Sequence, residues 1–367
     1  METFLGIDYQ VWWFLVFGAV ISGYAILDGF DLGAGALHLF LGKEESRRIA
    51  LNAIGPVWDG NEVWLVIGGG ALFAGFPIAY AAIFSAFYIP FMVFIVGLIW
   101  RGVAIEFRSK EPGLWWRKIW DIIYSFSSLT IAISLGLMLG NVALGIPLNK
   151  YQEYEGTGME FFNVFSVFVS ITTVALFMMH GAIFLAMKTE NRLYAKLSIL
   201  ARRFTIFFVV SFGITSMYTL LYIPHLSDQL KQNPALFLLP LGMFIAIANI
   251  PRQIKRQQFG YAFISSSLTI AFLLALVSFE VFPLLLRASN DPSLSLTIYN
   301  SSSSPSTMKT LLLIVAFLLM IVGGFNFLKY AGDVGVLSDY GKGYLLGSII
   351  LLLFGSVTSI FIIRAKL

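Results

Sequence analysis

The 367-residue chain contains no cysteine and only three histidines, His38, His180 and His225. Without cysteine the chain has no means to ligate an iron–sulfur cluster, to attach a c-type haem or to use a catalytic thiol. A haem with two axial protein ligands needs paired groups on facing helices, and three scattered histidines do not indicate such a pair. We therefore predict that this chain binds no haem or metal by itself.

Charged residues are also scarce. They make up 12% of the chain, whereas hydrophobic residues make up 58% and the mean hydropathy is +0.83. Soluble domains carry about twice this share of charge, so the bilayer is the main solvent. The fold class is predicted as an all-α integral membrane protein, a polytopic bundle that forms one transmembrane domain over residues 1–367. The connections are too short to form a separate catalytic domain.

The apolar runs predict nine transmembrane helices, or ten if the last run also spans, because each span needs roughly 20 apolar residues. The helices are expected near residues 11–40, 52–75, 78–105, 118–144, 161–187, 203–223, 235–250, 259–286, 309–328 and, for the last run, 343–363. The N-terminus lacks the basic segment of a cleavable signal, so the first run is interpreted as a retained helix.

Lysine and arginine fall on alternate connections up to the ninth helix. One set comprises Lys43, Arg47, Arg48, Arg101, Arg108, Lys110, Arg117, Lys118, Lys188, Arg192, Lys196, Arg202, Arg203, Arg252, Lys255 and Arg256. The other connections hold only Lys150, Lys231, Arg287 and Lys309. The positive-inside rule therefore puts the N-terminus outside. A tenth span would carry Arg364 and Lys366 outward, against this rule.

Four acidic residues lie inside predicted spans: Asp28 and Asp31 in the first helix, Asp59 and Glu62 in the second. Each pair is spaced i, i+3, which places both members on one helix face. An ionised acid at mid-membrane costs on the order of 3 kcal/mol, and such residues usually face a bundle interior or a wet cavity. Counted from the basic connection between the two helices, Asp31 and Asp59 come out level, roughly 16–18 Å from the inner rim.

Two further acids, Glu106 and Asp121, are expected near the cytoplasmic face, with Arg101 slightly deeper than Glu106. Together the acids would form a column of titratable groups entered from the cytoplasm, which is what a proton path requires. The alternative is a structural ion-pair network, which we consider for Arg101, Asp121, Asp28 and Glu106. Trp58, next to the acid at position 59, is a candidate contact for a partner or a cofactor.

Several segments resemble subunit II of the cytochrome bd-type quinol oxidases, the terminal oxidases of bacterial respiratory chains. The resemblance rests on GYAILDGFDLGAGALH (23–38), GPVWDGNEVWLVIGGGALFAGFPIAYAAIFSAFY (55–88), WRGVAIEFRSK (100–110), RKIWD (117–121) and SLTIYNSSSSPSTMKTLL (295–312). It touches most of the chain, and the WDGNEVW segment is highly specific. The sequence departs from the family pattern after about Phe325, where a further apolar run follows.

The resemblance implies a heterodimer in the bacterial cytoplasmic (inner) membrane. A larger subunit I would carry the b-type and d-type haems and the quinol site, and this chain would be its haem-free partner. Quinol would reduce O2 to water in the complex, with protons drawn from the cytoplasm. The family's functional positions map onto Asp31, Trp58 and Asp59. The resemblance leaves open whether small accessory subunits join, and whether a quinone binds to this chain as in some relatives. No nucleic-acid partner is expected.

Two other functions account for intramembrane acids. A proton- or cation-coupled secondary transporter would use the same acids in helices interrupted by glycine and proline, as around Gly55 and Pro56, and would act without a haem-bearing subunit. A purely structural scaffold would tolerate neutralisation of all four acids. The physical argument alone does not separate the oxidase subunit from the transporter, and the motif resemblance favours the oxidase.

Overall fold

The computed structural model describes residues 3–4 and 6–332, with side chains at residue 3, over residues 6–319 and at residue 321. The last predicted run, near 343–363, lies outside the described residues. Within these ranges the regular structure is helical except for four strands of two or three residues. The prediction of an all-α protein is therefore confirmed for the described part.

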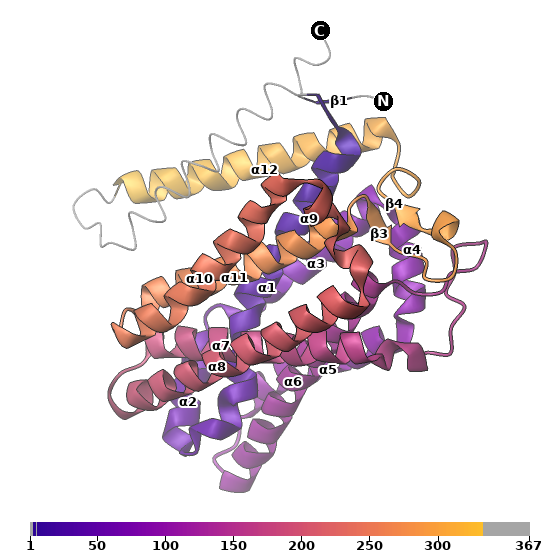
Figure 1. Ribbon diagram of the computed structural model, residues 1–367. Helices are drawn as coiled ribbons and strands as arrows, with labels where there is room; N and C mark the ends of the chain where they lie inside the picture. Colours follow the sequence, from indigo (N-terminus) through magenta and orange to yellow (C-terminus); the bar gives the residue numbers. More distant parts are fainter. Residues whose placement is uncertain (1–2, 5, 333–367) are drawn as a thin grey trace. The chain divides into compact units, whose positions relative to one another are not determined.

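The helices follow one another along the chain as Figure 1 shows. In chain order the elements are β1 (Thr3–Phe4), β2 (Ile7–Asp8), α1 (Tyr9–Leu37), η1 (His38–Leu41), α2 (Glu44–Ile54), α3 (Trp58–Gly75), α4 (Pro77–Ala86), α5 (Tyr88–Phe107), α6 (Leu114–Leu144), η2 (Met159–Phe162), α7 (Val164–Lys188), α8 (Asn191–Tyr222), η3 (Pro224–Ser227), α9 (Asp228–Gln232), η4 (Pro234–Phe237), α10 (Leu238–Lys255), α11 (Phe259–Val281), β3 (Leu284–Leu286), η5 (Pro292–Leu294), β4 (Leu296–Thr297) and α12 (Pro305–Gly332).

The described residues divide into two compact units. The smaller unit takes the chain up to Phe17, the segment Ala71–Pro77 and the chain from Ile298 onward. The larger unit takes Gly18–Gly70 and Ile78–Thr297. In the smaller unit, the Trp13 indole N–H donates to the carbonyl of Ala71 at 2.9 Å. That the whole chain acts as one transmembrane domain stays a prediction.

The larger unit is built on consecutive helices that pack as neighbours: α5 on α6, α6 on α7 and α7 on α8, with α10 and α11 paired and α11 against α7. The helix α1 crosses α7 at two glycines. A Cβ on Gly33 would collide with the Phe177 backbone of α7, and one on Gly181 would meet the backbone of Gly33 and Ala34. Only glycine permits this approach, which fixes α1 and its acids against the core.

Seven helical segments of the described chain are long and apolar enough to span a membrane. They are Tyr9–Leu41, Tyr88–Phe107, Leu114–Leu144, Val164–Lys188, Asn191–Tyr222, Pro234–Lys255 and Phe259–Val281. Pro77–Ala86 and Pro305–Leu319 are apolar but shorter. A count of nine or ten spanning helices therefore stays a prediction.

Two of the predicted helices are broken in the structure. The helix expected over 52–75 begins only at Trp58, and residues up to Ile54 belong to the separate helix α2. Gly55 and Pro56 lie between the two helices, where proline restricts the preceding residue and lacks a backbone donor. The helix expected over 78–105 is divided into α4 and α5 at Phe87. Although Gly55 and Pro56 indicate an interruption in the sequence, the apolar composition predicted a continuous helix at both places.

Two other boundaries also differ. The helix α8 begins at Asn191, twelve residues before the expected start at 203, because its polar first turns were interpreted as a connection. The helix α11 ends at Val281 rather than at 286, and Pro283, two residues later, has no N–H to continue the helix. Residues 284–286 form the strand β3 instead, paired antiparallel with β4.

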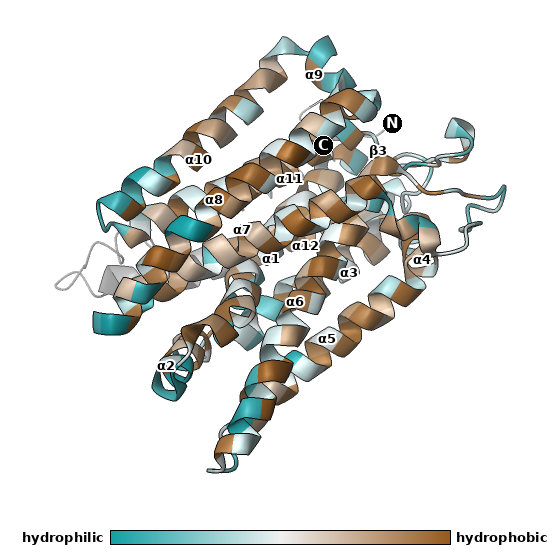
Figure 2. Cartoon of the chain, turned by 60° about the horizontal axis from the view of Figure 1, so that its bottom comes forward, coloured by the Kyte–Doolittle hydropathy of each residue, from teal (hydrophilic) through white to brown (hydrophobic). Residues whose placement is uncertain are grey.

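The connections that carry most of the basic residues gather at one end of the larger unit. The α2 region and the α5–α6, α7–α8 and α10–α11 connections lie toward the lower left in Figure 1. In Figure 2 these ends are hydrophilic, whereas the helices between the ends are mostly hydrophobic. This arrangement agrees with the alternation of charge in the sequence, and the outward N-terminus stays a prediction.

Candidate functional site

The Arg101 guanidinium of α5 is buried between acids from two other helices. Its Nη1 lies 2.7 Å from Oδ1 of Asp28 on α1, and the exposed fractions of the two side chains are 1% and 0%. Its Nε donates to Glu62 of α3 at 3.1 Å, and its Nη2 pairs with the same carboxylate. One cation therefore serves two acids, which leaves this group of three with one formal negative charge.

Asp31 lies beside this group but is held differently. The Asn61 amide of α3 donates to Oδ2 of Asp31 at 2.8 Å and also to the Leu27 carbonyl of α1 at 3.2 Å. The other carboxylate oxygen, Oδ1, is buried and has no hydrogen-bond partner among the described residues. The contact places the first turn of α3 level with the acids of α1, although the continuous helix from which that level was predicted does not exist.

Trp58 and Asp59 are the first two residues of α3 and lie on another face of that helix. Asp59 is exposed on this chain, as are Val63 and Val66 further along the same helix. A Cβ on Gly60 would meet nothing within 4 Å, so this face is open as well as apolar. Trp58 is half-buried, and its ring lies near Gly102 of α5. The acid at position 59 thus stands on an uncovered helix face, apart from the buried carboxylates.

Asp121 belongs to a second network at the basic end of the unit. Its carboxylate is 2.5 Å from Nε of Arg108, 3.1 Å from Nη1 of Arg47 and 2.5 Å from Nε2 of His38. Glu44 extends the network by pairing with Arg108 at 2.8 Å. The predicted members Arg101 and Asp121 therefore both form ion pairs, but in separate networks.

Glu106 joins neither network. Its side chain is exposed near the end of α5, whereas Arg108, two residues later, is buried with 2% of the residue exposed. The structure thus brings Asp28, Asp31 and Glu62 together with Arg101, and leaves Glu106 and Asp59 at the surface of this chain.

The acids and the motifs around them lie in a segment with a known family pattern. Residues 9–331 match the family model of cytochrome bd terminal oxidase subunit II. The chain belongs to this family. As a bd subunit II whose described part contains seven apolar helices long enough to span, it is a multi-pass membrane protein. The resemblance predicted from the motifs is confirmed.

Two curated relatives show how far the similarity extends. Cytochrome bd-I ubiquinol oxidase subunit 2 of Escherichia coli (strain K12) is 30% identical over 352 residues, which covers 86% of this chain and 92% of the relative. Cytochrome bd ubiquinol oxidase subunit 2 of Bacillus subtilis (strain 168) is 31% identical over 324 residues, covering 87% and 94%. The fold is similar to a chain of the bd oxidase structure from Geobacillus thermodenitrificans, with a TM-score of 0.73, 22% identity and coverage of 89% and 99%.

Each histidine of this bd subunit II has at least one ring nitrogen engaged by another group of the chain. His180 is fully buried, with Nδ1 against the Ser266 hydroxyl at 2.7 Å and Nε2 against the Ile26 carbonyl at 3.0 Å. Nε2 of His38 is engaged by a carboxylate in the second network. His225 lies in the short η3 segment and hydrogen-bonds the backbone of Ala143.

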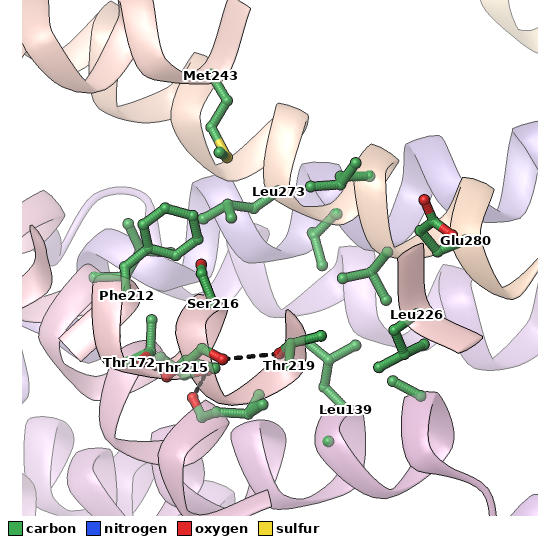
Figure 3. Close-up of a pocket in the computed structure, with 18 of the residues that line it drawn as sticks. Leu139, Thr172, Phe212, Thr215, Ser216, Thr219, Leu226, Met243, Leu273 and Glu280 are labelled. Carbon is green, nitrogen blue, oxygen red and sulfur yellow. Dashed lines mark hydrogen bonds between the residues drawn. The ribbon is translucent and has the colours of Figure 1, made fainter. Parts of the chain in front are cut away.

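The larger unit also contains an apolar cavity of about 410 Å³, bordered by α1, α6, α7, α8, α10 and α11. Figure 3 shows hydroxyl groups on one wall and Glu280 at one end. On that wall, the hydroxyl oxygens of Thr172 and Thr215 are 2.8 Å apart. Both oxygens of Glu280 accept backbone N–H groups of α9, at 3.1 and 3.0 Å. This acid therefore ties the short α9 segment over the end of the cavity.

Asn61, His38 and Tyr124 are among the residues in or beside the two networks that were not predicted as site residues. Asn61 stands inside the WDGNEVW motif, one position before Glu62. His38 follows Asp31 by seven residues, the spacing of two helical turns on one face. Tyr124 follows Asp121 by three residues and packs against His38, with ring centroids 5.0 Å apart. The i+7 spacing from a buried acid is the signal that could have found the histidine.

Proposed function

We propose that this chain is the haem-free subunit II of a bd-type quinol:O2 oxidase in a bacterial cytoplasmic membrane. It would assemble with a haem-bearing subunit I, which would also hold the quinol site. This chain would contribute a proton-uptake path from the cytoplasm. Family membership supports the oxidase complex. The observation that carries the proton path is that Asp31 lies buried beside Asp28 and Glu62, the two acids that pair with Arg101.

The charges of that group differ in how they are compensated. Asp28 and Glu62 share the Arg101 guanidinium, so moving a proton onto either would disturb an ion pair. Asp31 has an amide on one oxygen and no cation within ion-pair distance among the described residues. A buried carboxylate without a cation is costly, which favours the proton-bound form of the acid. We therefore assign to Asp31 the role of holding a proton, and to Arg101 a structural role.

Asp59 would continue the path toward the partner. An exposed acid within a turn of the level of Asp31 is costly in lipid, and the open face of α3 around Gly60 offers room for another helix to approach. We propose that subunit I covers this face and receives protons there. Trp58, which packs on α5, would hold the first turn of α3 in place.

We place the quinone expected from some relatives in the apolar cavity. Its volume of about 410 Å³ is in the range of small-molecule sites, and its lining is apolar except for a few hydroxyl groups and Glu280. Solvent extraction of the purified complex tests this: about one quinone per complex is expected, and Ser216→Trp, which fills the cavity, should remove it. An unchanged quinone content in that variant would contradict the placement.

The experiment that tests the proposed function begins with purification of this chain from its native membrane. A stoichiometric haem-bearing subunit and quinol-dependent O2 uptake are expected. Asp31→Asn and Asp59→Asn should slow O2 reduction at least about tenfold while the haem content persists, because a general acid or base typically contributes a hundredfold or more. Glu111→Gln, which neutralises an exposed acid in the α5–α6 connection, is the matched control.

Other outcomes identify the rival functions. If both variants retain the full rate, the acids are structural and the scaffold is favoured. If the chain purifies without a haem subunit and drives uptake into proteoliposomes, the transporter is favoured. No observation in the described residues favours either rival over the oxidase subunit.

A further inference from the structure

The two buried networks of the larger unit are separated along α1. Asp31 belongs to one network and His38 to the other, seven residues later. At about 1.5 Å per residue, they are roughly 10 Å apart along the helix axis. A proton passes directly only between atoms about 3 Å apart, so no direct transfer joins these two groups.

The Tyr124 side chain of α6 occupies the interval between them. Its ring packs edge-on against the His38 imidazole, with centroids 5.0 Å apart and planes at 86°. Gly35 lies between Asp31 and His38 on α1, and a Cβ there would be 3.2 Å from Cζ of Tyr124, the atom that bears the hydroxyl. The phenol therefore runs from the histidine toward the acid.

Three polar atoms along this line lack a protein partner. The Oδ1 of Asp31, the hydroxyl of Tyr124 and the Nδ1 of His38 are all buried, and none has a hydrogen bond among the described residues. By contrast, the buried hydroxyls of Ser127 and Ser128 on the same helix bond to the Tyr124 carbonyl. Buried polar groups without protein partners are normally satisfied by ordered water.

We propose that Tyr124 and ordered water join His38 to Asp31, so that Asp121, His38, Tyr124 and Asp31 form the inner segment of the proton path. This inference rests on the proposed function and names residues that carry it. The groups facing His38 are Asp121 of α6 together with Arg108, which directly follows α5, and Arg47 of α2, and both arginines bind the same carboxylate.

The transfer needs only N–H and O–H bonds to change. A proton taken up on the Asp121 side of the imidazole leaves from Nδ1 of His38 to water or to the Tyr124 oxygen. The phenol gives its own hydrogen toward Asp31 as it accepts the incoming one. Asp31 becomes a neutral carboxylic acid and no electron moves. The imidazole is left with its proton on Nε2 and the phenol with its hydrogen on the His38 side, so a turn of the hydroxyl and a return of the histidine to its first tautomer reset the relay before the next proton.

A purely structural tyrosine makes a different prediction. The aromatic ring fills space beside Gly35, but the hydroxyl has no protein bond among the described residues, so its removal should leave packing intact. Tyr124→Phe therefore separates the two roles, because it keeps the ring and removes only the group that transfers protons.

The test uses the purified oxidase complex with quinol and O2. Tyr124→Phe should lower the rate about tenfold or more and increase the solvent deuterium isotope effect, with haem content and thermal midpoint unchanged. Tyr194→Phe, a half-buried tyrosine of α8 that packs on Phe259, is the matched control and should behave as the parent. Asp31→Asn is measured in parallel as the reference for the path.

The outcomes are distinct. If Asp31→Asn is slow and Tyr124→Phe is not, the relay through the tyrosine is overturned and the proposed function stands. If neither variant is slow, both fail. Should Tyr124→Phe not assemble, His38→Gln serves instead: its amide keeps a donor for Asp121 but does not relay a proton. A slow His38→Gln complex supports the relay, and a full rate overturns it.

Discussion

Arg101 carries a positive charge in the interior of the larger unit, with 1% of its side chain exposed. We predict that Arg101→Gln lowers the free energy of unfolding by about 3–5 kcal/mol, the usual cost when one partner of a buried ion pair is removed. The cost arises because Asp28, with no exposed area, would keep its charge without a cation. The neighbouring Glu62 is 24% exposed and loses less.

A double-mutant cycle makes the prediction sharper. Asp28→Asn alone leaves Arg101 paired with Glu62, so a smaller loss of about 1–3 kcal/mol is expected. The double variant Arg101→Gln/Asp28→Asn removes both charges and should lose clearly less than the sum of the single variants. The free energy of unfolding is measured by SDS titration of the purified complex, with thermal midpoints as a second measure.

Arg252→Gln, which changes an exposed arginine at the end of α10, is the control and should stay within about 0.5 kcal/mol of the parent. The reasoning would be refuted if Arg101→Gln were as stable as this control. It would be refuted equally if the two single variants were additive, since additivity would mean that the ion pair contributes no coupling.

Three other predictions follow from the packing and from the segments outside the spans. Gly33→Ala should destabilise the complex by about 1–3 kcal/mol or more, because the added methyl meets the backbone of α7; Gly213→Ala, which meets nothing within 4 Å, should not lower the thermal midpoint. Glu280→Ala removes the acceptor for the first amides of α9, and hydrogen exchange of those amides should accelerate roughly fivefold; unchanged exchange would contradict the capping role. Burial lowers the pKa of His225 below its usual value, so the unfolded state binds more protons as the pH falls through about 6.5. Thermal midpoints at pH 7.5 and 5.5 should therefore show a smaller acid loss in His225→Gln than in the parent.

The class of the fold and the acids of the site were accessible from the sequence because both depend on composition. Apolar runs predict membrane helices, and a carboxylate inside such a run is conspicuous. The breaks between α2 and α3 and between α4 and α5 were missed, since they fall inside apolar sequence. Pro56 and Pro90 lie at or near these breaks. Because proline is also tolerated in the first turn of a helix, its position alone did not show whether a helix is interrupted there.

Most partners of the charged groups could not be predicted, because they depend on which helix faces meet. The ion-pair alternative grouped Arg101 with Asp28, Asp121 and Glu106, and of these three acids Asp28 pairs with it. Glu106, five residues away in sequence, is turned to a different face of the helix, and the second partner is Glu62 on α3. The role of Tyr124 depends on a glycine opposite its ring, a contact between α1 and α6 that no local pattern encodes.

The exposed carboxylate of Asp59 also bears on how the enzyme is made. Under the proposed pairing, a newly inserted copy that has not met its partner presents this acid to lipid. At about 3 kcal/mol the penalty corresponds to roughly a hundredfold shift in equilibrium, which association with subunit I relieves. The carboxylate that would pass protons in the assembled complex is thus also a group whose burial favours association of an unpaired chain with subunit I.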